Sequence, residues 1–219
     1  MSPTQKCAIL DLKPAQIAIG LLEIEHKIRQ FAHLSRDAFH DYSAAHPVPV
    51  VLSDHGLYII DHHHLCRAYH ELGHSHVQVA IQADFSDDPA GFWARMEAAN
   101  WVLPQDQFGV RHPYRHLPID IRGMADDPYR SLVWRLKELG YWTKVAVPFA
   151  EFQVANFFRP IVEIGNTKAS FGQGVAAAIA FLVAAPDERL AQVPGLARVP
   201  VQGAPDGPDA PDPSDPATH

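Results

Sequence analysis

The segment between Tyr58 and Gly73 constrains the fold most strongly, because a strand pattern gives way to a helix pattern within a few residues. A short apolar run is followed at once by Asp61, His62, His63 and His64. Apolar residues then recur at helical spacing, and Gly73 suits the left-handed conformation in which many helices end. The first turn of a helix offers unpaired amide groups and the positive end of the helix dipole. The pattern therefore predicts a strand-to-helix junction that can hold negative charge.

The pattern of apolar and turn residues in the rest of the chain predicts a small sheet followed by helices. We expect strands at residues 6–11, 48–53, 57–60 and 77–82, with a hairpin turn from Ser53 to Gly56 and an early helix at 21–34. Four more helices are expected at 89–99, 126–139, 148–158 and 168–185. Their aromatic residues sit mostly at helical spacing and are expected in the core.

Strands in the first part of the chain followed by helices in the second predict an α+β fold. A small mixed-sheet unit at residues 1–85 is expected to pack against a helical lobe at 86–200 within one globular domain. Residues 201–219 are rich in proline and aspartate, and we expect a disordered acidic tail there.

Charge and cysteine content narrow the class of protein. A formal net charge of −7 argues against a surface that coats DNA, since that requires clustered lysine and arginine. Cys7 and Cys66 form no CxxC pair, so neither a disulfide framework nor a cysteine zinc site is indicated. Neither a secretory signal nor a membrane span is indicated. We therefore expect a cytoplasmic protein that does not engage membranes.

Seven of the fourteen histidines lie between His55 and His76, and this cluster allows more than one interpretation. A purely structural role is one alternative. A zinc peptidase is another, because His70 to His74 matches HExxH, which needs both histidines on one helical face. Gly73 indicates that the helix ends between them, and Val77 and Ala80 occupy the places of the further glycine and histidine of the longer motif. Zinc is therefore not expected.

The order of strand, hairpin, Asp-x-His-His, helix and strand resembles the ParB and sulfiredoxin superfamily, and most closely its bacterial ParB-like nuclease group. The similarity covers most of the chain. The stretches that carry it are Leu12–Gln16 with Gly20 and Glu23, Asp61–Leu65, Asp126–Leu132 and Pro148–Phe152.

The resemblance implies that the Asp61–Leu65 signature binds nucleotide phosphates. It implies a phosphate site formed by His62, His63 and His64 together with Gln16 and Gly20, to which we add Lys27 as a cation. Phosphoryl transfer would need a base and Mg²⁺, so Glu23, Asp61 and His63 are the candidate catalytic residues, with Asp61 as a metal-holding carboxylate. The structural alternatives are that Glu23 stabilises the first turn of its helix through the dipole and that Asp61 caps the following helix. ATP, ADP or CTP with Mg²⁺ are the expected ligands. Of the three histidines, we expect His63 and His64 to face the ligand and His62 to form the turn.

Two positions depart from the related sequences. Leu65 stands where the kinase and sulfiredoxin forms carry a phosphate-binding arginine, so another cation would have to substitute; Lys27, Arg67 and Arg111 are candidates. His62 stands where those forms have glycine, which allows closer approach of phosphate to the backbone. Sulfiredoxin chemistry is not expected, because His63 occupies the position of the reactive thiol and Cys66 suits a buried apolar site.

Three functions follow from these observations. The first is binding of a nucleotide or phosphorylated small molecule, with phosphotransferase and nucleotide hydrolase as candidate activities. The second is a metal-dependent nuclease in which Arg111 and Arg115 contact nucleic acid, although the net charge does not favour that partner. The third is a non-catalytic regulatory protein that keeps the fold. The sequence does not specify an oligomeric state.

Overall fold

The computed structural model describes residues 4–165 and 167–201, which fall into two compact units. Unit 1 extends to Asp127 and unit 2 begins at Pro128. The division therefore comes later than the boundary expected near residue 85. Residues 86–127 join unit 1 because Phe92, Met96 and Val102 pack against Ala15 and Val51. Nearly all of the predicted tail, from residue 202 onward, lies outside the described residues.

Unit 1 contains the predicted small mixed sheet. Its strands are β1 (Thr4–Ala8), β2 (Lys13–Pro14), β4 (Val48–Ser53), β5 (Gly56–Ile59) and β6 (His76–Asp84), in the order β1-β6-β4-β5-β2. β6 runs antiparallel to β1 and parallel to β4, whereas β5 runs antiparallel to β4 and parallel to β2. The predicted hairpin is confirmed, with Ser53 opposite Gly56. A separate parallel pair joins β3 (Ala18–Ile19) to β7 (Ala125–Asp126).

The first predicted strand is shorter than expected. It ends at Ala8, and Ile9–Asp11 form a 3-10 helix, η1, whose Ile9 side chain is fully buried. Two further 3-10 helices lie at Tyr114–His116 (η2) and Ile121–Gly123 (η3).

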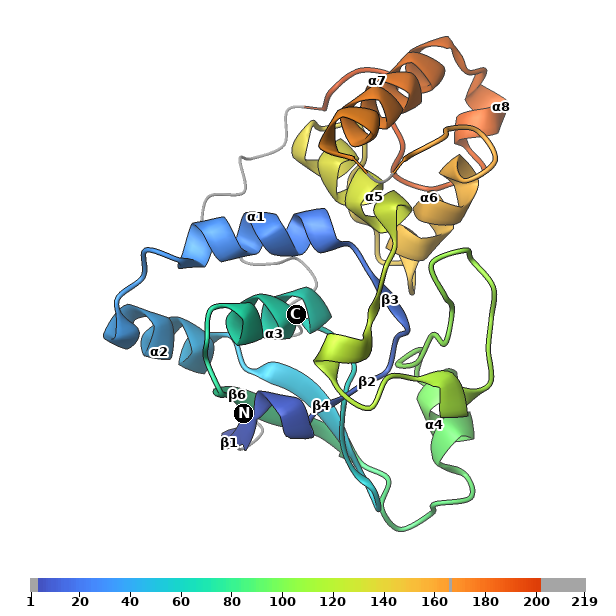
Figure 1. Cartoon of the computed structure of the whole chain (residues 1–219). Helices are drawn as coiled ribbons and strands as arrows, with labels where there is room; N and C mark the ends of the chain where they lie inside the picture. Colours follow the sequence, from blue (N-terminus) through green and yellow to red (C-terminus); the bar gives the residue numbers. More distant parts are fainter. Residues whose placement is uncertain (1–3, 166, 202–219) are drawn as a thin grey trace. The chain divides into compact units, whose positions relative to one another are not determined.

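Helices cover both faces of the sheet in unit 1. α1 (Leu21–Phe31), α2 (Arg36–Ala45) and α3 (His63–Glu71) share one core with Val50 and Ile59, while α4 (Phe92–Ala98) packs on the opposite face against Val51. Successive residues of a strand point to opposite faces, so the central strand β4 is buried on both sides. α1 and α3 lie side by side (Figure 1). α3 ends where predicted, with Gly73 at a φ of +85°.

Unit 2 is helical, as expected for the second half of the chain. Its helices are α5 (Pro128–Glu138), α6 (Ala150–Phe158), α7 (Lys168–Ala184) and α8 (Asp187–Leu190). The core contains Leu132, Leu136, Phe158, Ala178 and Leu182, each fully buried. Within the described ranges, none of the helices is long and apolar enough to cross a bilayer.

Candidate functional site

The strand-to-helix junction is built around an unusual backbone conformation at His62. This residue precedes the first residue of α3 and has a φ of 64° and a ψ of 23°, in the left-handed region that side chains other than glycine seldom occupy. Asp61 supports the turn, because its Oδ1 atom accepts a hydrogen bond of 2.7 Å from the backbone N–H of His62. The Nδ1 atom of His62 is buried without a hydrogen-bond partner. The turn is therefore strained, and it places the start of α3.

The start of α1 meets the start of α3 at a cluster formed by Gly20, Glu23, Lys27 and His64. The Nε2 atom of His64 lies 3.1 Å from Oε2 of Glu23 and 3.3 Å from the backbone nitrogen of Gly20. Oε1 of Glu23 lies 3.9 Å from Nζ of Lys27. A proton on Nε2 would satisfy the shorter of the two His64 contacts, since the carboxylate can only accept. The cluster thus joins a carboxylate, an imidazole and an ammonium group to two helix starts.

Asp126 adds a second carboxylate at the start of α1. Its Oδ1 atom accepts a hydrogen bond of 3.0 Å from the N–H of Leu21, the first residue of the helix. Burial raises the pKa of Asp126 above its ordinary value, and the charges of Asp127 and Glu25 add to the rise, whereas the Leu21 hydrogen bond opposes it. The sequence alone does not reveal this contact, because an acidic pair before Pro128 is typical of the start of the next helix.

His63 and His64 have different surroundings. His63 is only 3% exposed, whereas the side chain of His64 is 15% exposed and turns toward Glu23. Neighbouring residues of a helix point about 100° apart, which accounts for the difference. Leu65, at the position where related forms carry arginine, is 7% exposed and belongs to the core of unit 1.

The other predicted phosphate ligands lie in several places. Gln16 is in the segment between β2 and β3 and forms an isolated bridge with Leu103. Arg67 points away from the start of α3: its Nε atom donates to Glu71, and its Nη1 atom donates to the carbonyl oxygens of Ile121 and Arg122 at 3.2 and 3.3 Å. Of the three cations proposed to replace the missing arginine, Lys27 lies in the cluster with Glu23 and His64.

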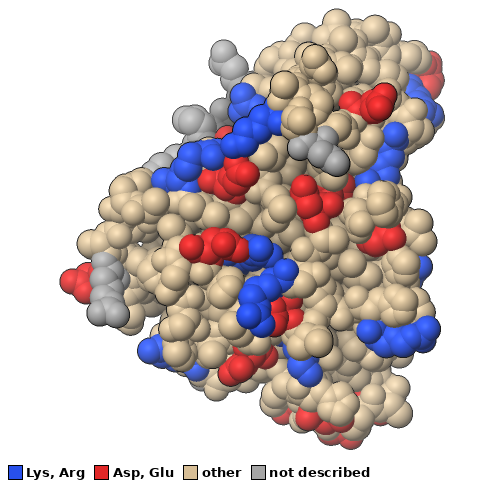
Figure 2. All heavy atoms as spheres, viewed as in Figure 1, with Lys and Arg blue, Asp and Glu red and all other residues tan. Residues whose placement is uncertain are grey.

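Arg111 and Arg115 lie in the segment that follows α4. Arg111 is paired with Glu97, and Arg115 is an exposed residue of η2, next to Tyr114, which stacks on Trp93. On the face of the described residues seen in Figure 2, lysine and arginine side chains alternate with aspartate and glutamate.

The remaining candidates have structural settings. His70 is in the last turn of α3, whereas His74 lies beyond Gly73 with its ring stacked on Phe39, so the two are not on one helical face. Cys66 is fully buried, and burial raises the pKa of its thiol. Within residues 4–165 and 167–201, no group of three histidine, cysteine, aspartate or glutamate side chains is arranged to hold a metal ion.

Comparisons with known proteins agree with this architecture. A family model described as "Putative ParB-like nuclease" matches residues 5–160. The crystal structure of protein Atu1540 from Agrobacterium tumefaciens is similar with a TM-score of 0.80 and 32% sequence identity, over 91% of this chain and 100% of that chain. None of the curated proteins compared with the chain matches it.

Proposed function

The chain belongs to the ParB-like family described as putative nucleases, and on that premise we propose that it binds the phosphate groups of a nucleotide, or of another phosphorylated small molecule, at the start of α3. We place this activity in the cytoplasm. Phosphoryl transfer and nucleotide hydrolysis are the activities that fit such a site.

The observation that carries the proposal is the meeting of two helix starts around His64. The N-cap residues Gly20 and His62 supply no side-chain cap to their helices. Each helix start carries roughly half a positive charge from the aligned peptide dipoles, and at α1 the first N–H, that of Leu21, already donates to Asp126. A protonated imidazole between the two starts adds a further positive charge. Such a combination favours an anion with several oxygen atoms.

The carboxylates nearby indicate that the anion arrives with a cation. Glu23 and Asp126 would repel a bare phosphate, and Lys27 offsets only one of the two charges. Mg²⁺ prefers oxygen ligands and commonly uses one or two carboxylates together with the phosphates of its substrate. Asp126 and Asp61 would supply such carboxylates, with phosphates and water completing the coordination, because the described residues contain no group of three side chains arranged to hold a metal ion. When bound, Mg²⁺ would neutralise negative charge on the phosphates.

Glu23 is also the group best placed to move a proton. Its contact with Nε2 of His64 fixes both side chains, and its position in the first turn of α1 puts it beside the start of α3. For phosphoryl transfer, Glu23 would accept the proton of the attacking water or hydroxyl as the new P–O bond forms. A protonated His64 would stay paired with Glu23 through Nε2 and would attract the phosphate oxygens with its positive charge. Glu23→Gln should therefore reduce turnover more than it reduces nucleotide affinity.

Isothermal titration calorimetry tests the binding. Wild-type protein and His64→Gln would be titrated with ATP, ADP and CTP, with and without Mg²⁺, and His70→Gln would serve as a matched control in the last turn of the same helix. We expect Mg²⁺-dependent binding that weakens about tenfold or more in His64→Gln, because the positive charge of the imidazole near the phosphates is lost. The control should bind as the wild type does. Equal binding by all three proteins, or none by the wild type, would contradict the proposal.

A metal-dependent nuclease is a second candidate, favoured by the description of the family to which the chain belongs. Plasmid and single-stranded DNA would be incubated with the protein and Mg²⁺ or Mn²⁺, using Arg115→Gln to test the proposed strand contact. Cleavage that falls in Arg115→Gln, together with no affinity for free nucleotides, would favour this function over the first. Inactivity in both assays would instead favour a non-catalytic regulatory protein.

A further inference from the structure

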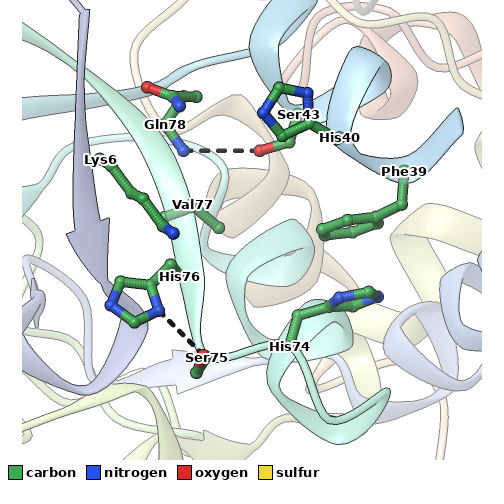
Figure 3. Close-up of a pocket in the computed structure, with 9 residues that line it drawn as sticks. All are labelled: Lys6, Phe39, His40, Ser43, His74, Ser75, His76, Val77 and Gln78. Atoms are coloured by element: carbon green, nitrogen blue, oxygen red, sulfur yellow. Dashed lines mark hydrogen bonds between the residues drawn. The ribbon is translucent and has the colours of Figure 1, made fainter. Parts of the chain in front are cut away.

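Unit 1 contains a pocket of about 190 Å³ that none of the assignments above uses (Figure 3). Strand β1 contributes Lys6, α2 contributes Phe39, His40 and Ser43, and the remaining lining runs from His74 to Gln78. The last group comprises the loop after α3 and the beginning of β6. The pocket therefore lies toward the C-terminal end of α3, whose nine residues span roughly 13 Å. It is distinct from the junction at the start of that helix.

The lining is rich in groups that can carry positive charge. Lys6 is an ammonium, and His40, His74 and His76 are imidazoles, whereas no acidic side chain is among the nine lining residues, all within the described part of the chain. Asp41 lies outside the lining, with its Oδ1 atom 3.7 Å from Nδ1 of His40. The whole chain has a formal net charge of −7, so this composition differs from that of the chain as a whole. A concave surface lined by one sign of charge concentrates ligands of the opposite sign.

The strand register places Lys6 and His76 on one face of the sheet. Lys6 pairs with Gln78 across β1 and β6, and His76 lies two residues before Gln78 on the same strand. Residues two apart on a strand point to the same face, and diagonal neighbours on paired strands lie about 7–8 Å apart. That separation lets an ammonium and an imidazole bind one tetrahedral oxyanion from two sides. Figure 3 shows the Lys6 and His76 side chains on the same side of the pocket, across from Phe39.

Contacts among the lining residues hold the pocket in shape. Oγ of Ser43 accepts a hydrogen bond of 3.4 Å from the N–H of Gln78, which ties α2 to β6. The rings of Phe39 and His74 are parallel to within 2°, with centroids 3.4 Å apart. Oγ of Ser75 lies 2.9 Å from Nδ1 of His76 and so orients that imidazole. Little rearrangement is needed before a ligand binds, and preorganisation of this kind increases affinity.

We propose that this pocket is a second anion site, which binds inorganic phosphate or the phosphate group of a small phosphorylated ligand through Lys6 and His76. His40 and His74 add positive charge when protonated, and Ser43, Ser75 and Gln78 supply neutral polar groups. The ammonium of Lys6 disfavours a metal ion as the occupant. The site differs from the α3 junction in that its lining carries no carboxylate, so it binds the anion without Mg²⁺.

Sulfate provides the sharpest test, because its charge stays at −2 at both pH 6 and pH 8, so any change in affinity comes from the protein. Calorimetric titration should show saturable binding about tenfold tighter at pH 6 than at pH 8, because an imidazole attracts an anion by charge only in its protonated form. Inorganic phosphate titrated at pH 8 should compete with sulfate. The titratable groups concerned are Lys6, His40 with its neighbour Asp41, His74 and His76.

Variants locate the binding. Lys6→Gln and His76→Gln change exposed side chains and should each weaken sulfate about tenfold. His55→Gln is the matched control, since His55 is an exposed histidine outside the pocket with 74% of its side chain accessible. His64→Gln should leave sulfate binding intact even if it abolishes nucleotide binding, so the two proposals can fail separately. Equal losses in His55→Gln, loss in His64→Gln, absence of saturable sulfate binding, or tighter binding of Zn²⁺ than of sulfate would each overturn this assignment.

Discussion

Replacing His62 by glycine tests whether the junction is strained as its backbone indicates. The left-handed conformation of a residue with a Cβ atom costs about 1–2 kcal/mol, and glycine removes that cost. The buried Nδ1 atom without a partner costs about 1 kcal/mol or more, and it disappears as well. Two costs oppose these gains. The greater chain entropy of unfolded glycine costs about 1 kcal/mol, and the lost packing of the partly buried ring costs about 1 kcal/mol.

The sum predicts that His62→Gly is at least as stable as the wild type, by up to about 1 kcal/mol, which corresponds to up to about 3 °C in Tm. His62→Ala keeps the Cβ atom at a positive φ, so it should be less stable than His62→Gly by about 1 kcal/mol. Urea unfolding of the three proteins, followed by far-ultraviolet circular dichroism with equal m-values as the check, measures both differences. An alanine variant as stable as the glycine variant would show that the left-handed backbone is not strained.

Three further changes probe other features of unit 1. Tyr69 is fully buried and its hydroxyl has no hydrogen-bond partner, so Tyr69→Phe should unfold at the same urea concentration as the wild type or a higher one; a loss above about 1 kcal/mol would indicate a bound water. Arg67→Gln should cost about 2 kcal/mol in urea unfolding, because the charged donor to the carbonyls of Ile121 and Arg122 is lost; an unchanged midpoint would contradict this. Burial raises the pKa of Asp126 above 3.8, so this carboxyl loses its proton at a lower pH in the unfolded chain than in the folded protein. The stability of the wild type relative to Asp126→Asn should therefore fall as the pH rises from about 4 to the folded pKa, and then stay level. Urea unfolding across this range measures the difference, and a constant difference would show that the pKa is not raised.

The elements that the sequence predicted well are those with strong local signals. The hairpin around Ser53 and Gly56, the end of α3 at Gly73 and the later helices all follow from turn residues and apolar spacing. α2 was missed, although Ser35 accepts a hydrogen bond from the N–H of Ala38 as an N-cap residue should. Its apolar residues are few, so the pattern of spacing was weak.

The sequence predicted the strand-to-helix junction at which the candidate site is proposed, but not all of the contacts made there. The short-range features at Asp61 and His62 could be anticipated because they depend on neighbouring residues. The contacts of His64 with Gly20 and Glu23 join residues more than forty positions apart, and the family resemblance, rather than any local pattern, pointed to Glu23. Asp126 was missed because its partner, Leu21, is more than a hundred positions away. The direction of a helical side chain also depends on packing, so the sequence could not show that His63 is buried.

The position of β1 at the edge of the sheet gives Lys6 a second consequence. An edge strand presents unpaired backbone groups that can recruit the strand of another molecule, and a charged side chain on such a strand discourages that pairing. β1 is the outermost strand beside β6, and Lys6 lies at its middle. A lysine at this position disfavours pairing of β1 with a strand of a neighbouring copy. Concentrated samples of Lys6→Gln should therefore self-associate more readily than those of the wild type.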